Sequence, residues 1–256
     1  MLKKKKYPIL EFDDNKKAFI NPSDVLEKYG VHEFPSKLII CFFREVMDSL
    51  IQKNEVIPII TIQGENPDTF YKFKDKDIAI TQGLIGAPAC VGLLEEGIGL
   101  GAKKIILCGG CGSLEKNVTL GKIIVVNGAI RDEGTSFHYM KPSVDVMADF
   151  GIVKTLSDYF ENNHIDYVVG KTWTTDAFYR ETKDRIERRK KQGAIIVEME
   201  QAAMFAVARF RGVQYGAIIY GGDDLSGEKW DPRKWRNRVD IRAKLVAFSR
   251  DLVELI

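Results

Sequence analysis

Two carboxylates separated by a single residue are the side chains best placed to do chemistry. Glu198 and Glu200 follow residues 192–197, a short apolar run typical of a buried strand, and precede residues 202–210, which are rich in helix formers. A carboxylate there lies against the hydrophobic core and is costly unless a donor hydrogen-bonds to it. One interpretation is that Glu200 occupies the first turn of the helix, where the macrodipole favours an acid. The other is that it receives a cation or a ligand with several hydroxyl groups.

Glycine-rich segments follow the predicted strands in four places. They are residues 82–87, 109–112, 128–134 and 221–222. Ligands of α/β sheets bind at the carboxyl ends of strands, and glycine lets a ligand approach the backbone closely. None of the segments matches a dinucleotide or nucleoside-triphosphate fingerprint. Together with Phe178, Met199 and Asp223 at other strand ends, they predict a pocket for a ligand that is both flat and hydroxylated.

The elements that must position these residues alternate between strands and helices. Strands are predicted at residues 37–43, 56–62, 77–81, 104–108, 122–127, 167–172, 192–197 and 215–220. Helices are predicted at residues 44–52, 90–100, 143–162, 182–191, 202–210 and from 235 onward. This alternation predicts an α/β fold, a single domain with a mixed, mainly parallel sheet flanked by helices. Pro58 suggests that its strand lies at a sheet edge. Residues 1–36 are polar and are predicted to be an extension packed on the domain, which spans residues 37–256.

Composition narrows the class of protein. The chain has 256 residues, 45% of them hydrophobic, and 38 basic against 36 acidic residues give a net charge of only +2. No global field therefore points to nucleic acid as a partner. We find no segment resembling a signal peptide and no apolar stretch long enough to span a bilayer, which predicts a soluble, cytoplasmic protein without a membrane partner.

The cysteines leave a redox or metal role open. Cys108 and Cys111 have Cys-x-x-Cys spacing, which fits a redox pair or half of a zinc site. There is no second such pair, and the three histidines, His32, His138 and His164, are scattered. Because Cys108 also ends an apolar run, it is expected to behave as a small hydrophobe. We therefore predict no metal site.

Five segments carry a joint signal in their order along the chain. They are Gly83–Pro88, Gly109–Leu114, Ala129–Tyr139, Thr174–Tyr179 and Val197–Ala203. Together they resemble the nucleoside phosphorylases and nucleosidases of the purine/uridine phosphorylase superfamily. The run Arg131–Tyr139 is most similar to the uridine phosphorylase branch. The resemblance covers residues 77–256 well and the first third of the chain poorly.

The resemblance implies a role for each matching position. Met199 and Glu200 would hold the ribose, with Glu198 beside them, and an ionised carboxylate suits a vicinal diol because it only accepts hydrogen bonds. Phe178 would stack on the base. Asp223 would be the acid that protonates or hydrogen-bonds the departing base. Glu200 and Asp223 are therefore the predicted catalytic residues.

The phosphate positions of this family are only partly matched. Of its Gly-Asp-Pro-x-Arg loop, residues 40–44 keep only Arg44, while Leu107 and Gly110 stand where the family has an arginine and a serine or threonine. Leucine cannot replace the bidentate guanidinium that matches phosphate. Thr182 and Asp184 stand where a glutamine and an arginine would read uracil. The histidine that an amino-terminal segment often lends to a neighbouring subunit has no clear counterpart.

Three hypotheses follow. The first is a nucleoside phosphorylase of purine or pyrimidine salvage, with phosphate held by Arg44, Gly110 and the neighbouring amides of residues 109–112; Arg131 is a further donor or supports its own loop. The second is a nucleosidase that uses water, because Leu107 and Gly110 weaken the phosphate site. The third is a catalytically silent nucleoside-binding paralogue. The resemblance implies a homodimer or hexamer and requires no metal or organic cofactor, with phosphate as a co-substrate.

Overall fold

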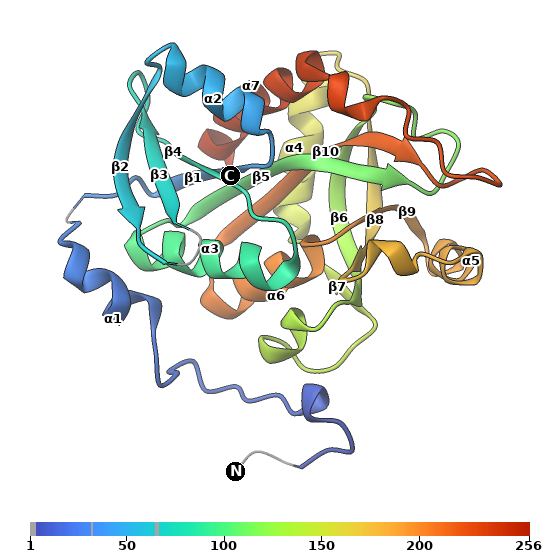
Figure 1. Ribbon diagram of the computed structural model, residues 1–256, viewed down its shortest axis with the longest axis horizontal. Helices are drawn as coiled ribbons and strands as arrows, with labels where there is room; N and C mark the ends of the chain where they lie inside the picture. Colours follow the sequence, from blue (N-terminus) through green and yellow to red (C-terminus); the bar gives the residue numbers. More distant parts are fainter. Residues whose placement is uncertain (1–3, 32, 65–66) are drawn as a thin grey trace.

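The computed structural model describes residues 4–31, 33–64 and 67–256, so that His32 falls outside the described residues (Figure 1). The strands are β1 (Lys37–Cys41), β2 (Val56–Ile62), β3 (Asp68–Phe73), β4 (Ala79–Gln82), β5 (Lys104–Ser113), β6 (Ile123–Asp132), β7 (Asp145–Met147), β8 (Tyr167–Thr175), β9 (Ala194–Glu198) and β10 (Gln214–Asp224). The α-helices are α1 (Pro22–Leu26), α2 (Arg44–Gln52), α3 (Ala87–Leu100), α4 (Phe150–Asn162), α5 (Lys183–Lys191), α6 (Gln201–Arg211) and α7 (Val239–Leu255). Short 3-10 turns include η3 (Thr135–His138) and η4 (Phe178–Arg180).

The strands form one mixed sheet that partly closes on itself. Strand β5 pairs with both β9 and β10, β10 pairs with β6, and β8 joins β6 to β9. On its other side β5 continues the sheet through β1, β4, β3 and β2. The pairs β4–β1, β1–β5, β5–β10, β6–β8 and β8–β9 are parallel, and the others are antiparallel. Strand β2, which contains Pro58, lies at the sheet edge as predicted.

Helices cover the sheet on both faces. In Figure 1, α2 and α7 lie above the sheet and α3 and α6 below it. Side chains alternate between these layers along β1, because Leu38 and Ile40 belong to the core cluster that contains α3 and α6, while Ile39 and Cys41 face α2, α4 and α7. The fold is therefore the predicted α/β arrangement. The carboxyl ends of the parallel strands β4, β1, β5 and β10 lie side by side, and β9 crosses the end of β5 in the antiparallel direction. We refer to this region as the strand-end edge.

Three of the glycine-rich segments predicted as loops are strand. Residues 109–112 lie within β5, 128–132 within β6 and 221–222 within β10. Glycine is needed here for close packing, since a Cβ on Gly221 would lie 2.7 Å from the Thr119 carbonyl oxygen and one on Gly112 would lie 2.6 Å from Leu225. Of the fourth segment, residues 83–86 form a loop as predicted, between β4 and α3, and Gly86 in it has a φ of +96° that other residues rarely adopt.

Two further predictions are corrected. Residues 143–162 are not one helix, because β7 comes first and α4 begins only after Asp149, whose carboxylate accepts a hydrogen bond from the Ile152 N–H at 3.0 Å. Strand β3 was not predicted at all. It pairs in antiparallel fashion with β2 before it and β4 after it, and this pairing supports its extended form.

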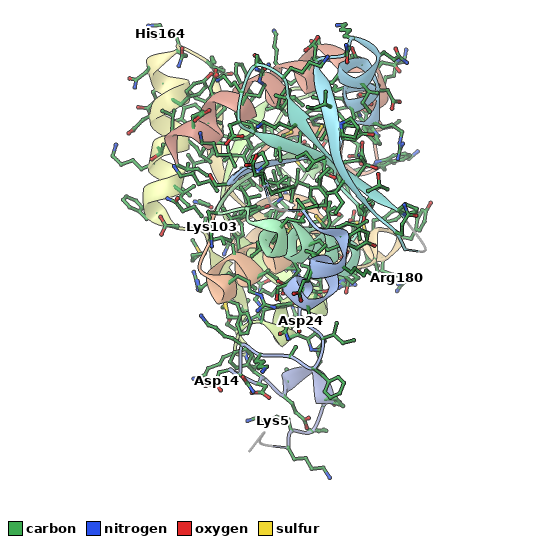
Figure 2. All side chains as sticks on the ribbon, turned by 90° about the vertical axis from the view of Figure 1, so that its left-hand side faces the viewer. Lys5, Asp14, Asp24, Lys103, His164 and Arg180 are labelled. Carbon is green, nitrogen blue, oxygen red and sulfur yellow. The ribbon has the colours of Figure 1, made fainter. Side chains whose placement is uncertain are left out.

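The N-terminal segment has one packed part and one projecting part. Helix α1 packs on α3, where a Cβ on Gly99 would lie 2.8 Å from Leu26. Figure 2 shows Lys5 and Asp14 on a stretch that extends away from the body of the molecule, at the opposite end from His164. Arg211 donates a hydrogen bond at 3.2 Å to the Lys16 carbonyl oxygen on this stretch. The division between residues 36 and 37 stays a prediction.

The Cys-x-x-Cys pair does not form a redox site in this fold. All four cysteines are free and buried. Cys108 and Cys111 lie three residues apart on β5 and belong to core clusters on opposite faces of the sheet. Within the described residues, no group of three or more histidine, cysteine or acidic side chains could hold a metal ion. No helix in the described part is long and apolar enough to cross a membrane.

Candidate active site

Glu198 is built into the fold by its own hydrogen bonds. One carboxylate oxygen accepts from the backbone N–H groups of Glu200 and Gln201, both at 2.7 Å. The other accepts from the hydroxyls of Thr174 at 2.5 Å and Thr172 at 3.2 Å on the neighbouring strand β8. The carboxylate thereby satisfies two N–H groups at the start of α6, and the four donors together offset part of the cost of burying it. In this structure Glu198 therefore supports the junction, and its predicted contact with a substrate stays a prediction.

Glu200 differs from Glu198 in its partners. Its side chain is 8% exposed, and its oxygens accept only from backbone N–H groups, that of Gly86 at 2.7 Å and that of Met199 at 3.3 Å. Burial, and then the Glu198 charge, raise the pKa of Glu200 to about 8. Because four donors stabilise ionised Glu198, the proton that this pair retains resides on Glu200.

The hydrogen bond from Gly86 brings two predicted segments together. Gly86 precedes the first residue of α3, has a positive φ, and donates its N–H to Glu200. The loop of residues 82–87 and the β9–α6 junction thus meet, although 114 residues separate the two bonded residues. Met199 lies between the two acids and is partly buried.

Asp223 lies near the end of β10 and is partly buried. Its Oδ2 accepts a hydrogen bond at 2.6 Å from the indole N–H of Trp230. Its Oδ1 lies above Gly112, where a Cβ would approach it to 3.6 Å. Burial raises the pKa of Asp223, and the bond from Trp230 opposes that rise. A carboxyl with a raised pKa is suited to donate a proton.

Cys111 connects the two acidic ends of the site. It lies on β5 with 7% of its surface exposed. The pKa of its thiol is raised by burial and then by the charges of Glu198 and Asp223, so it lies within electrostatic reach of both. Strands β9 and β10 both pair with residues 111–113 of β5, so the fold brings the acids of the β9–α6 junction close to the acid on β10.

Phe178 and Glu181 border the same edge. Phe178 lies in η4, is 50% exposed and has its ring centroid 4.1 Å from that of Tyr179. Burial and the Asp223 charge raise the pKa of the partly buried Glu181 to about 7. Glu181 was missed from the sequence. Its position in the sequence could have indicated it, because Glu181 lies between Phe178, a predicted ligand contact, and the predicted helix that became α5.

The strand ends β1, β4 and β5 form an apolar part of the edge. Leu107 is 2% exposed and lies in the core. The Phe42 ring covers two glycines, since a Cβ on Gly83 would lie 2.6 Å from it and one on Gly109 would lie 3.6 Å away. Arg44, the first residue of α2, is exposed and makes no hydrogen bond or ion pair with the part of the chain that the structure describes.

Gly110 is exposed where β1 has ended. The Phe42 N–H donates to the Cys108 carbonyl at 3.1 Å, so the peptide groups of Cys108 face β1. Strand alternation turns those of Gly110 to the same side, before β9 joins β5 at Gly112. Gly109 and Cys111 face β10 instead. Of the amides that were expected to bind an anion together, the strand geometry therefore presents that of Gly110.

Arg131 supports its own loop. It donates from Nε to the Ser136 hydroxyl at 2.8 Å, and from one terminal nitrogen to the Lys141 carbonyl and the Ser143 hydroxyl, both at 2.7 Å. Its guanidinium also lies 4.2 Å from the Phe137 ring centroid. With these partners Arg131 is a loop support rather than an anion donor.

Comparison with known proteins gives one family. The model of the phosphorylase superfamily matches residues 37–253. The chain is 32% identical over 183 residues to a guanosine phosphorylase of Halorubrum lacusprofundi, covering 68% of this chain and 76% of that protein. It is 26% identical to a uridine phosphorylase of Thermococcus kodakarensis, covering 57% and 58%. In structure it is similar to an AMP nucleosidase of Bacteroides thetaiotaomicron, with a TM-score of 0.72, 17% identity and coverage of 91% and 96%.

Proposed function

The chain belongs to the phosphorylase superfamily, and we propose that it cleaves the N-glycosidic bond of a purine nucleoside with phosphate as the acceptor. One observation carries the proposal. Glu200 lies just after β9 and Asp223 lies on β10, and these two strands pair with the same stretch of β5, residues 111–113. Cleavage of this bond needs an acceptor for the sugar hydroxyls and an acid for the departing base, and these two groups have the matching chemistry.

The sugar end relies on Glu200. Its oxygens are bonded only to two backbone N–H groups, so lone pairs remain for a vicinal diol. The transition state resembles an oxocarbenium ion, and its positive charge favours the ionised form of Glu200. Glu198 acts as a positioning residue, because its bonds to the N–H groups of Glu200 and Gln201 fix the start of α6. Met199 provides a partly buried apolar surface beside the ribose.

The base end relies on two acids. Asp223, whose pKa is raised, donates a proton or a hydrogen bond to a ring nitrogen of the base. Glu181 lies within electrostatic reach of Asp223 and accepts from N–H groups on another edge of the base. A purine offers both kinds of group, and one relative is named a guanosine phosphorylase. Thr182 and Asp184, in the positions expected to read uracil, provide no such match. Phe178 stacks on the base face.

We place the phosphate that accepts the sugar next to the ends of β1, β4 and β5. Arg44 has no charged partner in the described part of the chain, and the Gly110 amide is exposed. A guanidinium and a backbone N–H together suit an anion. A second candidate is hydrolysis by water, which the apolar Leu107 and Phe42 favour because they provide no donor to phosphate.

A nucleoside panel tests the proposal. Release of free base from purine and pyrimidine nucleosides is followed by chromatography in phosphate buffer, with heat-denatured protein as the inactive control. We expect the wild type to release purines faster than pyrimidines. Equal or faster release of pyrimidines would contradict the purine assignment. Binding of nucleosides without any release would favour a silent paralogue.

A further inference from the structure

Trp230 is an exposed aromatic residue that bonds to the acid at the base end. Its side chain is 63% exposed, yet its indole N–H donates to Asp223 Oδ2 at 2.6 Å. An indole nitrogen can only donate, so this bond always stabilises the ionised carboxylate over the neutral carboxyl at that oxygen. The bond also leaves Oδ1 as the oxygen above Gly112.

The loop that carries Trp230 is held in place by the neighbouring acid, Asp224. The backbones of Asp224 and Asp231 exchange two hydrogen bonds, at 2.8 and 2.9 Å, which close the loop of residues 225–230. The Asp224 carboxylate also accepts from the Ser226 N–H at 2.8 Å and from Arg233 at 2.5 Å. Arg233 in turn donates to the Val118 carbonyl at 3.0 Å. Trp230 is therefore adjacent in sequence to Asp231, whose backbone is bonded to Asp224 near the end of β10.

The backbone beyond the loop is strained. Arg233 and Lys234 have φ values of +45° and +50°, which are uncommon for residues other than glycine. Such conformations persist where the surrounding structure fixes them, and they gather at functional sites. The ion pair of Arg233 with Asp224 provides that constraint here.

We propose that Trp230 is a positioning residue for the departing base, which fixes the Asp223 carboxyl through Oδ2 so that Oδ1 is presented to the base. The inference rests on the proposed function, in which Asp223 is the acid for the base. The indole sets both the orientation and the proton affinity of that acid. Charged or titratable groups that also face Asp223 are Glu181, Cys111, Asp224 and Arg233.

Kinetics of Trp230→Phe test the proposal, because phenylalanine keeps a ring and removes the N–H donor. We expect kcat to fall about 10- to 100-fold, the range for a hydrogen bond to a charged group, with little change in KM. The alkaline limb of the pH–rate profile moves to higher pH, because loss of the donor raises the pKa of Asp223. In the Asp223→Asn background the same substitution has no further effect. Lys229→Ala, on the same loop, is the control and leaves the profile unchanged.

An unmoved pH limb, or losses that multiply in the double variant, would overturn the positioning role. A second measurement does not depend on turnover. The indole N–H resonance of Trp230, identified by its absence in Trp230→Phe, shifts in Asp223→Asn and titrates with Asp223. An indole resonance insensitive to both would refute the hydrogen bond. If the wild type releases no base at all, the proposed function fails, and this resonance alone decides whether Trp230 fixes Asp223.

Discussion

The two halves of the strand-end edge differ in how their side chains are bonded. In the half formed by β8, β9 and β10, the acids are held by defined donors, such as the four that bond to Glu198 and the indole that bonds to Asp223. In the half formed by β1, β4 and β5, Phe42 and Leu107 present carbon atoms. Under the proposed function, the groups that recognise sugar and base therefore belong to the hydrogen-bond network of the fold. The acceptor half lacks such a network and depends on few groups.

The half formed by β8, β9 and β10 contains two pairs of acids, and in both pairs one acid has more hydrogen bonds within the protein than the other. Glu198 and Asp224 are bonded into the fold, the first at the start of α6 and the second at the base of the loop with Trp230. Glu200, two residues after Glu198, and Asp223, next to Asp224, have fewer internal hydrogen bonds. Burial raises the pKa of both glutamates, to about 8 for Glu200 and to about 7 for Glu198, and it also raises the pKa of Asp223. Each pair thus divides into one acid that holds the backbone and one that faces the proposed ligand.

The largest effect is expected from removing the charge at the sugar end. Glu200→Gln should lower kcat/KM about 100-fold, since hydrogen bonds to a charged group contribute about 3 kcal/mol at most and the charge also stabilises the transition state. The amide oxygen can still accept from the Gly86 N–H, so the melting temperature should not fall. Steady-state kinetics and a thermal melt check both points. Turnover within twofold of the wild type would remove Glu200 from the sugar site.

The second effect separates the two aspartates of β10. Asp223→Asn should slow purine nucleosides by about 30-fold and pyrimidine nucleosides much less, because the amide cannot donate a full proton to the base. Asp224→Asn is the comparison, and it should lower the melting temperature and, because Asp224 holds the loop that carries Trp230, slow purine nucleosides by less than Asp223→Asn does. Equal losses for the two kinds of nucleoside in Asp223→Asn would dissociate this residue from base activation.

A smaller effect is expected in the apolar half. Arg44→Ala should raise the KM for phosphate about tenfold and leave the KM for the nucleoside unchanged, since a single exposed guanidinium contributes modestly to anion binding. Initial rates at several phosphate concentrations measure this. Lys53→Ala, just beyond the far end of α2, is the control for a general change of charge. If both variants have the wild-type KM for phosphate, Arg44 does not hold the anion.

The last effect concerns stability as a function of pH and not activity. The folded pKa of Glu200, about 8, exceeds its ordinary value of 4.5, so its contribution to stability is fully present below about pH 4.5 and is lost as pH rises through 8. Glutamine does not titrate, so Glu200→Gln does not lose stability at this position as pH rises. The melting temperature of the variant relative to the wild type should therefore increase between pH 5 and pH 8 and level off above. A constant difference over this range would mean that Glu200 is ionised throughout.

Sequence patterns predicted the elements better than the contacts. The run around Glu198 and Glu200 predicts a strand followed by a helix, and the structure has β9 and α6 there. The same run cannot tell which acid caps the helix, because Thr172 and Thr174 on a neighbouring strand decide it. Hydrophobic periodicity is local, whereas these partners lie more than twenty residues away.

Glycine is where the sequence misled. Clusters at residues 109–112 and 221–222 are typical of loops, yet they belong to β5 and β10. At Gly112 and Gly221, residues from neighbouring segments of the same chain leave no space for a side chain. Glu181 and Trp230 were missed for a related reason. Each matters only because the fold brings it close to Asp223, and neither has a local pattern that indicates this.

The sugar product of the wild type tests the central claim most directly. A purine nucleoside is incubated with the protein in phosphate buffer, and the reaction is followed by ³¹P NMR together with an assay for free ribose. We predict a new sugar phosphate signal that grows in step with the released base, and no release when phosphate is omitted. Free ribose released at the same rate without phosphate would contradict the account and make the apolar half of the edge the mark of a hydrolase.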